Sequence, residues 1–325
     1  MEIYLNMNFV DPYTKSRLNK DKNGNLYCEN GEKHVVYINN DGIYDFTSHS
    51  LEKKAYDHKY RDLDIRIPTL KNLQKTWKDE ITPSMPILLN SLGNLFGKKV
   101  LLLGNGTSLK ELYFLHLGAK VVYTDLSFEA VKSVQHSYSL SELNKNGRTD
   151  IEFHAVNALY LPFEDASFDI IYGYAFVHHI DNIELFFSEV YRCLKNGGIC
   201  RFMDDAYSPI WDFMKMKLLK PLFDLRLKKR FISPEDLRCT IKGGFRNEDV
   251  TNLMYQFGFK KVLFIRVSFF VRLFRRGVGL LFNWNPRMLA KANLLVRYLK
   301  WIDNIAGRST LMQNNQIELI WGFDK

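Results

Sequence analysis

The sequence predicts an α/β protein: a seven-stranded, mostly parallel sheet with helices on both faces, preceded by a small β-ribbon and carrying a helical cap. Three observations predict this class. A strand, a glycine turn, a helix and a second strand follow one another over residues 98–125. Apolar runs and helical segments then alternate up to residue 205, and two more strand-like runs lie beyond residue 259. Such alternation is typical of a doubly wound parallel sheet.

The first strand–helix–strand unit has the features of a nucleoside-binding site. Val100 to Leu103 is the short apolar run that a buried parallel strand needs, and the glycine turn after it lets a ligand approach the backbone closely. Asp125 stands at the carboxyl end of the second strand, where open parallel sheets bind ligands. A carboxylate there can accept two hydrogen bonds from a ribose diol. The predicted contacts are Gly104, Asn105, Gly106 and Asp125.

The glycine turn argues against a dinucleotide cofactor. The dinucleotide fingerprint carries a third glycine three residues after the second, and this chain has Leu109 there. A nicotinamide dehydrogenase is therefore the weakest of the enzyme classes considered.

Length and cysteine content limit the number of domains and the cellular compartment that we expect for the protein. The chain has 325 residues, enough for one large domain or a large one plus a small one. Its first residues lack the pattern of a signal peptide, and no apolar run approaches the roughly 18 residues of a spanning helix. Its four cysteines are scattered, which predicts neither disulfides nor a zinc site. We expect a cytoplasmic protein, with peripheral contact to the inner face of the membrane left open.

The charge is unevenly distributed along the chain. Residues 201–325 carry 23 basic and 11 acidic side chains, whereas residues 1–200 carry 22 and 25. The C-terminal third is therefore strongly basic and the nucleoside-binding part is near neutral. This asymmetry predicts an anionic partner for the C-terminal third, such as a phosphate-bearing substrate, a membrane surface or a nucleic acid.

A specific resemblance covers roughly residues 98–205. After the third strand, its pieces follow in one order: Asn157-Ala158, Leu161 to Phe163, Ala166 to Asp169, His178-His179-Ile180, and a helix ending at Leu194 to Gly198. In order and spacing this passage resembles the class I S-adenosylmethionine-dependent methyltransferases that act on small molecules and lipids. The resemblance implies their Rossmann-like sheet, with an antiparallel seventh strand, and S-adenosylmethionine as the cofactor.

The resemblance also implies roles for residues at the strand ends. Asn157 can hydrogen-bond the adenine edge, and Ala158 can offer its backbone N–H to a ring nitrogen. Leu126 and Leu159 can enclose the ring, and Tyr174 lies beside the sulfonium. The chain departs from many relatives, which have an acid or a glycine, at three positions: Leu102, Ser108 and Asn157. An enzyme and a non-catalytic scaffold that keeps the fold both stay open.

Four residues are candidates for a general base: His178, His179, Asp204 and Asp205. The sulfonium is a strong electrophile, so the protein mainly has to hold donor and nucleophile in line. An oxygen acceptor can still require a base. The alternative for each histidine is a packing role.

Residues 1–49 are predicted to form a small separate β-ribbon module, because short extended runs alternate with Asn-Gly and Asp-Gly turns. The pattern resembles the zinc-ribbon-like module found ahead of some methyltransferases. Asp11 stands where the first cysteine is usual, and only Cys28 remains, so we expect no bound metal. Residues 50–325 are assigned to the methyltransferase domain.

Two basic segments, 206–245 and 270–312, are not needed to build the sheet. We expect them to cap the carboxyl ends of the strands and to contact an anionic acceptor. The second contains an apolar stripe at helical spacing: Met288, Ala292, Leu295, Leu299 and Ile302. This stripe predicts either a lid helix that is buried on the sheet or an interfacial helix on lipid head groups. No RNA-binding motif is present, so nucleic acid is not the expected partner.

The predicted function is methyl transfer from S-adenosylmethionine, by O-methylation of a glycan, a lipid-linked intermediate or another small-molecule acceptor. An RNA methyltransferase is the first alternative, favoured by the basic C-terminal third and tested by RNA-dependent methyl incorporation. A non-catalytic scaffold is the second, and failure to bind S-adenosylmethionine would support it. The oligomeric state stays open.

Overall fold

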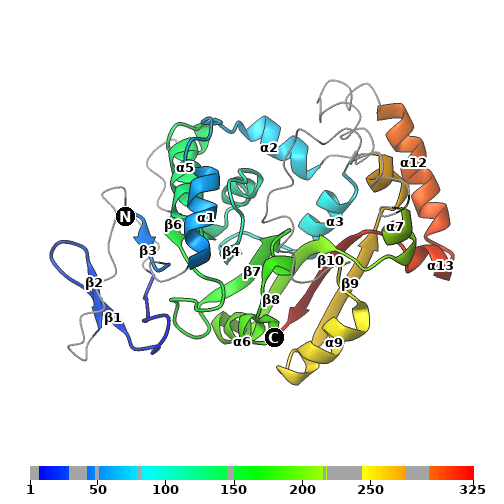
Figure 1. Ribbon diagram of the computed structural model, residues 1–325. Coiled ribbons are helices and arrows are strands. Elements are labelled where there is room, and N and C mark those ends of the chain that lie inside the picture. The colour runs from blue at the N-terminus through cyan, green and yellow to red at the C-terminus, as the bar shows by residue number, and fades with distance from the viewer. Residues whose placement is uncertain are drawn as a thin grey trace.

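The computed structural model describes residues 7–28, 42–47, 51–78, 82–144, 150–214, 217, 244–274 and 293–325. Its centre is an eight-stranded sheet in the order β3-β6-β5-β4-β7-β8-β10-β9, and a two-stranded ribbon, β1-β2, lies near the β3 edge (Figure 1). The strands are β1 (Leu18–Lys20), β2 (Leu26–Cys28), β3 (Tyr44–Asp45), β4 (Lys99–Leu103), β5 (Lys120–Asp125), β6 (Ile151–Ala155), β7 (Phe168–Tyr174), β8 (Leu194–Asp205), β9 (Lys261–Val267) and β10 (Glu318–Asp324).

Helices cover both faces of this sheet (Figure 1). The α-helices are α1 (Leu51–Tyr60), α2 (Leu70–Trp77), α3 (Ser84–Ser91), α4 (Tyr113–His116), α5 (Phe128–Ser139), α6 (Ile183–Cys193), α7 (Pro209–Met214), α9 (Asn247–Gln256), α12 (Asn293–Ala306) and α13 (Thr310–Gln313). Short 3₁₀ turns are η1 (Lys110–Leu112), η2 (Glu142–Asn144) and η3 (Val177–His179).

The predicted fold class is confirmed, with one difference in strand count. Among the described strands of the large sheet, only β10 runs in the direction opposite to all the others, as the resemblance implied. The eighth strand is β3, which pairs in parallel with β6 through Tyr44 and Asp45. The sequence assigned this segment to the N-terminal module. Pairing with β6 instead covers what would be an open edge of the sheet.

The strand pattern explains why both faces carry helices. Alternate residues of β4 point to opposite sides: Val100 and Leu102 join the apolar cluster that includes α2 to α5, and Leu101 and Leu103 join the cluster that includes α6 and α9. All four side chains are buried. A strand buried on both faces reads as a continuous apolar run, which is how the sequence marks it.

The N-terminal segment packs on the main domain through a few defined contacts. Phe9 forms an isolated β-bridge with Phe163, and the Lys15 ammonium lies 2.6 Å from a carboxylate oxygen of Glu189 on α6. The expected ribbon is present as the antiparallel pair β1-β2, which joins Leu18 to Cys28. That the segment is a module of its own, without zinc, stays a prediction.

One expectation, on the end of α6, needs correction, and another, on the cap, lies partly outside the described residues. The segment from Leu194 to Gly198 belongs to β8 rather than to the end of α6, and a register shift between Phe168 and Ile170 of β7 accommodates it. Of the predicted cap, the structure describes α7, α12 and α13. Residues 218–243 and 275–292, with Met288 and Ala292 of the stripe, lie outside the described residues.

Candidate active site

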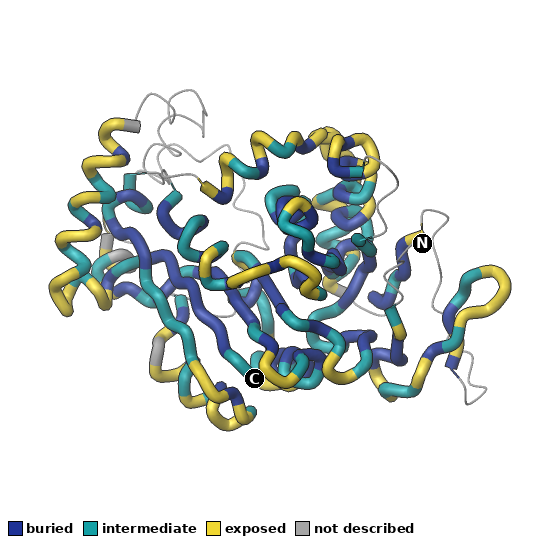
Figure 2. The backbone as a smooth tube through the Cα atoms, turned by 180° about the vertical axis from the view of Figure 1, so that it is seen from behind, coloured by how far each residue is buried: buried dark blue, intermediate teal, exposed yellow. Residues whose placement is uncertain are grey.

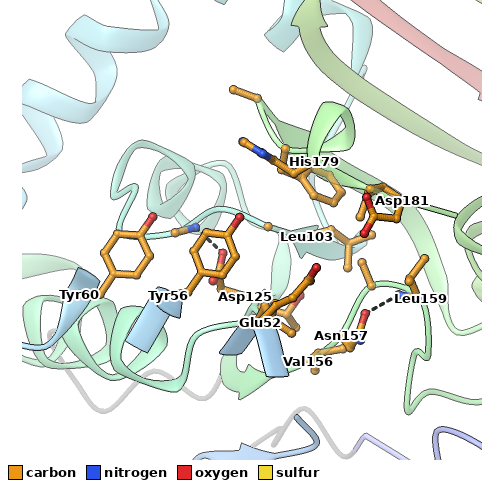
Figure 3. Close-up of a pocket in the computed structure, with 18 of the residues that line it drawn as sticks. Glu52, Tyr56, Tyr60, Leu103, Asp125, Val156, Asn157, Leu159, His179 and Asp181 are labelled. Carbon is orange, nitrogen blue, oxygen red and sulfur yellow. Dashed lines mark hydrogen bonds between the residues drawn. The ribbon is translucent and has the colours of Figure 1, made fainter. Parts of the chain in front are cut away.

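A cavity of about 280 Å³ opens where the carboxyl ends of β4, β5, β6 and β7 face helix α1 (Figure 3). Strands β4 and β7 are neighbours from which the chain runs outward in opposite directions. This is the switch point at which open α/β sheets bind ligands. The predicted site residues in its wall are Gly104, Gly106, Asp125, Leu126, Asn157, Ala158 and His179.

Asp125 is the buried anion of this cavity. Its two carboxylate oxygens accept hydrogen bonds from the backbone N–H groups of Gly106, at 2.7 Å, and Ser127, at 2.9 Å. Burial raises the pKa of Asp125, against the lowering effect of these two bonds. A carboxylate has about four acceptor positions, so lone pairs remain for a ligand. The bond to Gly106 also joins the end of β5 to the glycine turn after β4.

The glycine turn is needed for packing, whereas the sequence predicted that it lets a ligand approach the backbone. Gly104 and Gly106 have φ of +61° and +54°, a region that favours glycine. A Cβ at Gly104 would overlap the ring of Phe176, and one at Gly106 would lie 3.2 Å from the hydroxyl of Tyr60. Aromatic side chains of the protein itself therefore cover both glycines. Phe176 and Tyr60 also line the cavity.

The end of β6 supplies the wall predicted for an adenine ring. The Asn157 side-chain oxygen accepts a hydrogen bond from the backbone N–H of Leu159, 3.0 Å away (Figure 3). This bond fixes the amide at the rim. Within the described residues, the backbone N–H of Ala158 has no acceptor. Leu126 and Leu159 add apolar surface to the same part of the cavity.

Two predicted cofactor residues are not part of the cavity wall. The ring of Tyr174 is covered by the ammonium of Lys110, 3.6 Å from the ring centroid. Asn105 is buried, and its side-chain amide makes no hydrogen bond within the described part of the chain. Contact of either residue with a cofactor stays a prediction.

Helix α1 brings residues to the site that are not among the predicted site residues. Glu52, Tyr56, Lys59 and Tyr60 line the cavity on the side opposite the strand ends (Figure 3). From the sequence alone, surface packing is the favoured role for Tyr56 and Tyr60, and covering a cofactor is the alternative. The available signal was the spacing of Tyr56 and Tyr60, four residues apart and therefore on one helix face.

A histidine–aspartate pair lies beside the cavity. Nδ1 of His178 lies 2.8 Å from Oδ1 of Asp204, and the Trp321 indole N–H donates to Oδ2 at 3.3 Å. The Asp204 side chain is fully buried, whereas that of His178 is 24% exposed. Burial raises the pKa of Asp204, and the bond to His178 acts in the opposite direction. The His178 and His179 ring centroids lie 4.1 Å apart, and His179 is in the cavity wall.

Asp205 is committed to a different contact. It lies 3.0 Å from the guanidinium of Arg272, which also lies 2.9 Å from Glu318 on β10. Burial alone would lower the pKa of Arg272, but these two carboxylates raise it. The sequence predicted that the basic segment 270–312, which contains Arg272, contacts an anionic acceptor. The structure instead pairs Arg272 with acids that are distant in sequence.

The sheet order, the glycine turn, the strand-end aspartate and the cavity define a nucleoside-binding domain of the methyltransferase type. Residues 101–202 match the family model of the methyltransferase domain. The chain therefore carries a methyltransferase domain of the class I, S-adenosylmethionine-dependent kind, and the resemblance noted in the sequence is confirmed for this part.

Several similar proteins are methyltransferases by name. Ubiquinone/menaquinone biosynthesis C-methyltransferase UbiE of Bartonella quintana is 32% identical over 157 residues, which cover 47% of this chain and 54% of that protein. Phosphoethanolamine N-methyltransferase 2 of Caenorhabditis elegans is 33% identical over 113 residues, or 31% of this chain and 26% of that protein. The chain thus spans about half the length of the first relative and less of the second.

Among solved structures, phosphoethanolamine N-methyltransferase 2 of Haemonchus contortus, in complex with S-adenosyl-L-methionine, aligns with 75% of this chain and 52% of its own. The identity is 16% and the TM-score 0.47.

The described residues fit the cofactor of this class. Asp125 keeps acceptor positions for a ribose diol, and Ala158 keeps a backbone donor at the rim. Leu126 and Leu159 flank the same space. Gly104 is not an open cradle, because Phe176 covers it. A cofactor therefore has to share the space above the turn with this ring.

Proposed function

We propose that the protein transfers a methyl group from S-adenosylmethionine to a hydroxyl group of a small-molecule acceptor, and that His178 is the general base. The observation that carries this proposal is the buried Asp204 carboxylate 2.8 Å from Nδ1 of His178, whose ring centroid lies 4.1 Å from that of His179 in the cavity wall. A buried carboxylate that fixes a histidine at a cavity is a recurring arrangement for proton transfer.

Residues at the strand ends and on α1 would hold the cofactor from opposite sides. Asp125 would accept hydrogen bonds from the ribose, and Leu126 and Leu159 would enclose the adenine. Ala158 would donate its backbone N–H to an adenine ring nitrogen. Tyr56 and Tyr60 of α1 would close the cavity from the other side. When bound, S-adenosylmethionine supplies an electrophilic methyl group on a sulfonium.

The chemistry at His178 follows from its partner. Because Nδ1 donates to Asp204, the proton of the neutral ring resides on Nδ1 and the lone pair on Nε2. Nε2 would accept the acceptor's hydroxyl proton as the acceptor oxygen takes the methyl group, and the electron pair of the broken carbon–sulfur bond would stay on sulfur, which leaves as a neutral thioether. The buried Asp204 carboxylate stabilises the imidazolium that forms. The proton then leaves His178 to solvent, since this side chain is partly exposed.

Two named relatives and the charge of the C-terminal third support the acceptor class. The two relatives quoted above are named as a C-methyltransferase of quinone biosynthesis and an N-methyltransferase of phosphoethanolamine, so they support a small-molecule acceptor, and the choice of a hydroxyl group rests on the proposed base His178. A base is also useful for a quinol-type acceptor, because removal of its O–H proton raises electron density on oxygen and on the ring. We therefore propose a small, hydroxyl-bearing acceptor, lipid-linked or glycan in nature. The basic C-terminal third supports an anionic group on it.

Two variants test the assignment of the base. His178→Gln keeps an amide that can donate to Asp204 but cannot accept a proton. Asp204→Asn removes the charge that stabilises the imidazolium. Each should lower methyl incorporation from labelled S-adenosylmethionine into lipid and small-molecule extracts of the source cells by about 10²- to 10⁴-fold. Their affinity for S-adenosylmethionine should stay close to that of the unaltered protein. His136→Gln, on the exposed face of α5, is the matched control.

The outcomes separate the rival functions. Full activity of folded His178→Gln protein would remove His178 as the base. Calorimetry that finds no S-adenosylmethionine binding to the unaltered protein would favour a non-catalytic scaffold. Incorporation that depends on added RNA would favour an RNA methyltransferase.

A further inference from the structure

Exposed apolar side chains concentrate on one helix, α12. Leu294, Tyr298, Trp301 and Ile305 are 82%, 57%, 58% and 45% exposed. Their spacing of four, three and four residues places them on one face of the helix. Figure 2 shows this helix at one edge of the molecule, with exposed residues along it. An exposed apolar stripe of this size marks an interaction surface.

The direction of this stripe is fixed by the other face of the helix. Val296 is buried, and the Asp303 carboxylate accepts hydrogen bonds from the backbone N–H groups of Phe269, Phe270 and Val271 at 2.8–3.0 Å. These bonds join α12 to the segment that follows β9. Rotating the stripe inward would turn Asp303 away and leave these three backbone N–H groups without their acceptor. The stripe therefore points outward in the folded protein.

The polar residues of α12 give this surface a positive edge. Asp303 is the helix's single acid, and its carboxylate is buried and bonded to backbone. Arg297 and Lys300 are the charged side chains that remain. On the side of Lys300, a cavity of about 290 Å³ has Lys300, Arg308 and Arg266 in its wall, together with the bonded Asp303. The surroundings of the stripe are therefore basic on balance.

We infer that α12 docks on an anionic membrane surface. Tyr298 and Trp301 would lie at the level of the lipid head groups, and the basic edge would face lipid phosphates and carboxylates. Their rings are stacked, with centroids 5.8 Å apart. Aromatic rings with a polar tip, next to aliphatic and basic side chains, favour the membrane–water interface.

The geometry favours lying on the bilayer over crossing it. At 14 residues, α12 is about 21 Å long, shorter than the roughly 30 Å hydrocarbon core. Across the residues that the structure describes, none of the helices has the length and apolar character to span a membrane. A second copy of the chain is a poorer partner, because it would bring a like-charged edge against this one. A nucleic acid would leave the aliphatic side chains without an apolar partner.

This surface is linked to the candidate base by short contacts. Asp303 holds the segment that contains Arg272, and Arg272 pairs with Asp205, the neighbour of Asp204. Docking would therefore bring a lipid-borne acceptor to the edge of the sheet at which the strands end, where His178 follows β7. The docking surface itself does not depend on the proposed activity.

The test measures binding of the full chain to two kinds of vesicle. We expect the protein to sediment with vesicles of phosphatidylcholine and phosphatidylserine, and not with phosphatidylcholine alone. Binding should fall as salt is added, because screening weakens the attraction. Tyr298→Ser combined with Trp301→Ser should weaken it on the order of tenfold. Tyr255→Ser on α9 is the matched control, because Tyr255 is as exposed as Tyr298.

A charge pair tests the positive edge separately. Arg297→Gln with Lys300→Gln should weaken binding to the anionic vesicles about fivefold for each charge removed. Lys71→Gln with Lys75→Gln on α2 should leave it unchanged. S-adenosylmethionine affinity, measured on each variant, should not change, which separates a failure here from a failure of the proposed function.

Three results would overturn the inference. The unaltered protein could fail to bind anionic vesicles. The α12 variants could bind them as well as the Tyr255→Ser control does. Or size-exclusion chromatography could show a dimer that the α12 variants lose, which would make a second copy the occupant of the stripe.

Discussion

Asp125→Asn is the sharpest test of the cofactor site. The two backbone N–H groups that meet this side chain bond to different carboxylate oxygens. An asparagine can keep one of these bonds, but its NH₂ group would face the other donor. The lost charge-assisted bond should cost about 1–3 kcal/mol of the free energy of unfolding. The loss of stability should be near the lower end of this range. Burial disfavours the charged carboxylate, which is why it raises the pKa of Asp125, and a neutral amide avoids the cost of burying a charge.

The effect on cofactor binding should be larger than the effect on stability. Asparagine offers the ribose a neutral acceptor in place of a charged one, and the glycine turn loses its tie to β5. A loss of about 2–3 kcal/mol corresponds to an affinity for S-adenosylmethionine weaker by roughly 30- to 150-fold. Isothermal titration calorimetry measures the affinity, and thermal unfolding followed by circular dichroism measures the stability.

Asp57→Asn is the matched control for this experiment. Asp57 lies close by on α1, but a single oxygen, Oδ1, accepts both of its hydrogen bonds, from Ser127 Oγ and from the Glu129 N–H. Asparagine keeps an oxygen that can accept both bonds, so cofactor affinity should stay near that of the unaltered protein. If Asp125→Asn is folded and binds S-adenosylmethionine as tightly as the unaltered protein does, Asp125 is not the ribose ligand.

Three further changes test the packing and electrostatics around the site. Gly104→Ala should destabilise the fold by about 2–4 kcal/mol in denaturant unfolding, because a Cβ at positive φ would overlap Phe176; adding Phe176→Ala should recover part of this loss, and no recovery would contradict the packing argument. Glu189→Gln should lower stability by about 1–3 kcal/mol at neutral pH. Burial alone would raise the pKa of Glu189, but its bonds to Arg192 and Lys15 lower it, so the stabilisation is full above the unfolded value near 4.3 and is lost as pH falls through the folded pKa. The difference between the two proteins, followed by urea unfolding, should therefore shrink in acid, and a gap that stays constant down to pH 3 would refute the assignment. Burial raises the thiol pKa of Cys193 and Cys200 to about 12, so iodoacetamide at pH 8 should label neither until urea is added, as peptide mass spectrometry can verify.

The sequence was sufficient for the parts of the fold that are local. Val100 to Leu103 is apolar because both faces of β4 are buried, so the strand is visible in the sequence itself. Asp125 was identified by its position after β5, and its place in the cavity wall follows from strand order. The antiparallel β10 came from family resemblance, not from its residues.

What the sequence did not predict depends on contacts distant in the chain. Nothing near Phe176 indicates that its ring fills the space left by Gly104, more than 70 residues earlier. Arg272 has no acid close to it in sequence, yet the fold brings Asp205 and Glu318 to it. Periodicity identified Leu295, Leu299 and Ile302 on α12, but not the neighbouring exposed face formed by Leu294, Tyr298, Trp301 and Ile305. Asp303 fixes which face points outward through backbone groups that no side-chain pattern records.

The insertion of β10 between β8 and β9 has a consequence for the order in which the site forms during folding. The cofactor wall lies on β4 to β7: the pairings of β4 with β5 and of β5 with β6 join segments close together in the chain, and β4 pairs with β7 across a longer separation, Val100 with Ile170. Asp204 instead receives its second partner from Trp321, 117 residues away in sequence. Contacts across long loops form late, because loop closure has to precede them. We expect the cavity that Asp125 lines to form before the contact between Asp204 and Trp321 during folding, so that cofactor binding would precede any proton transfer at His178.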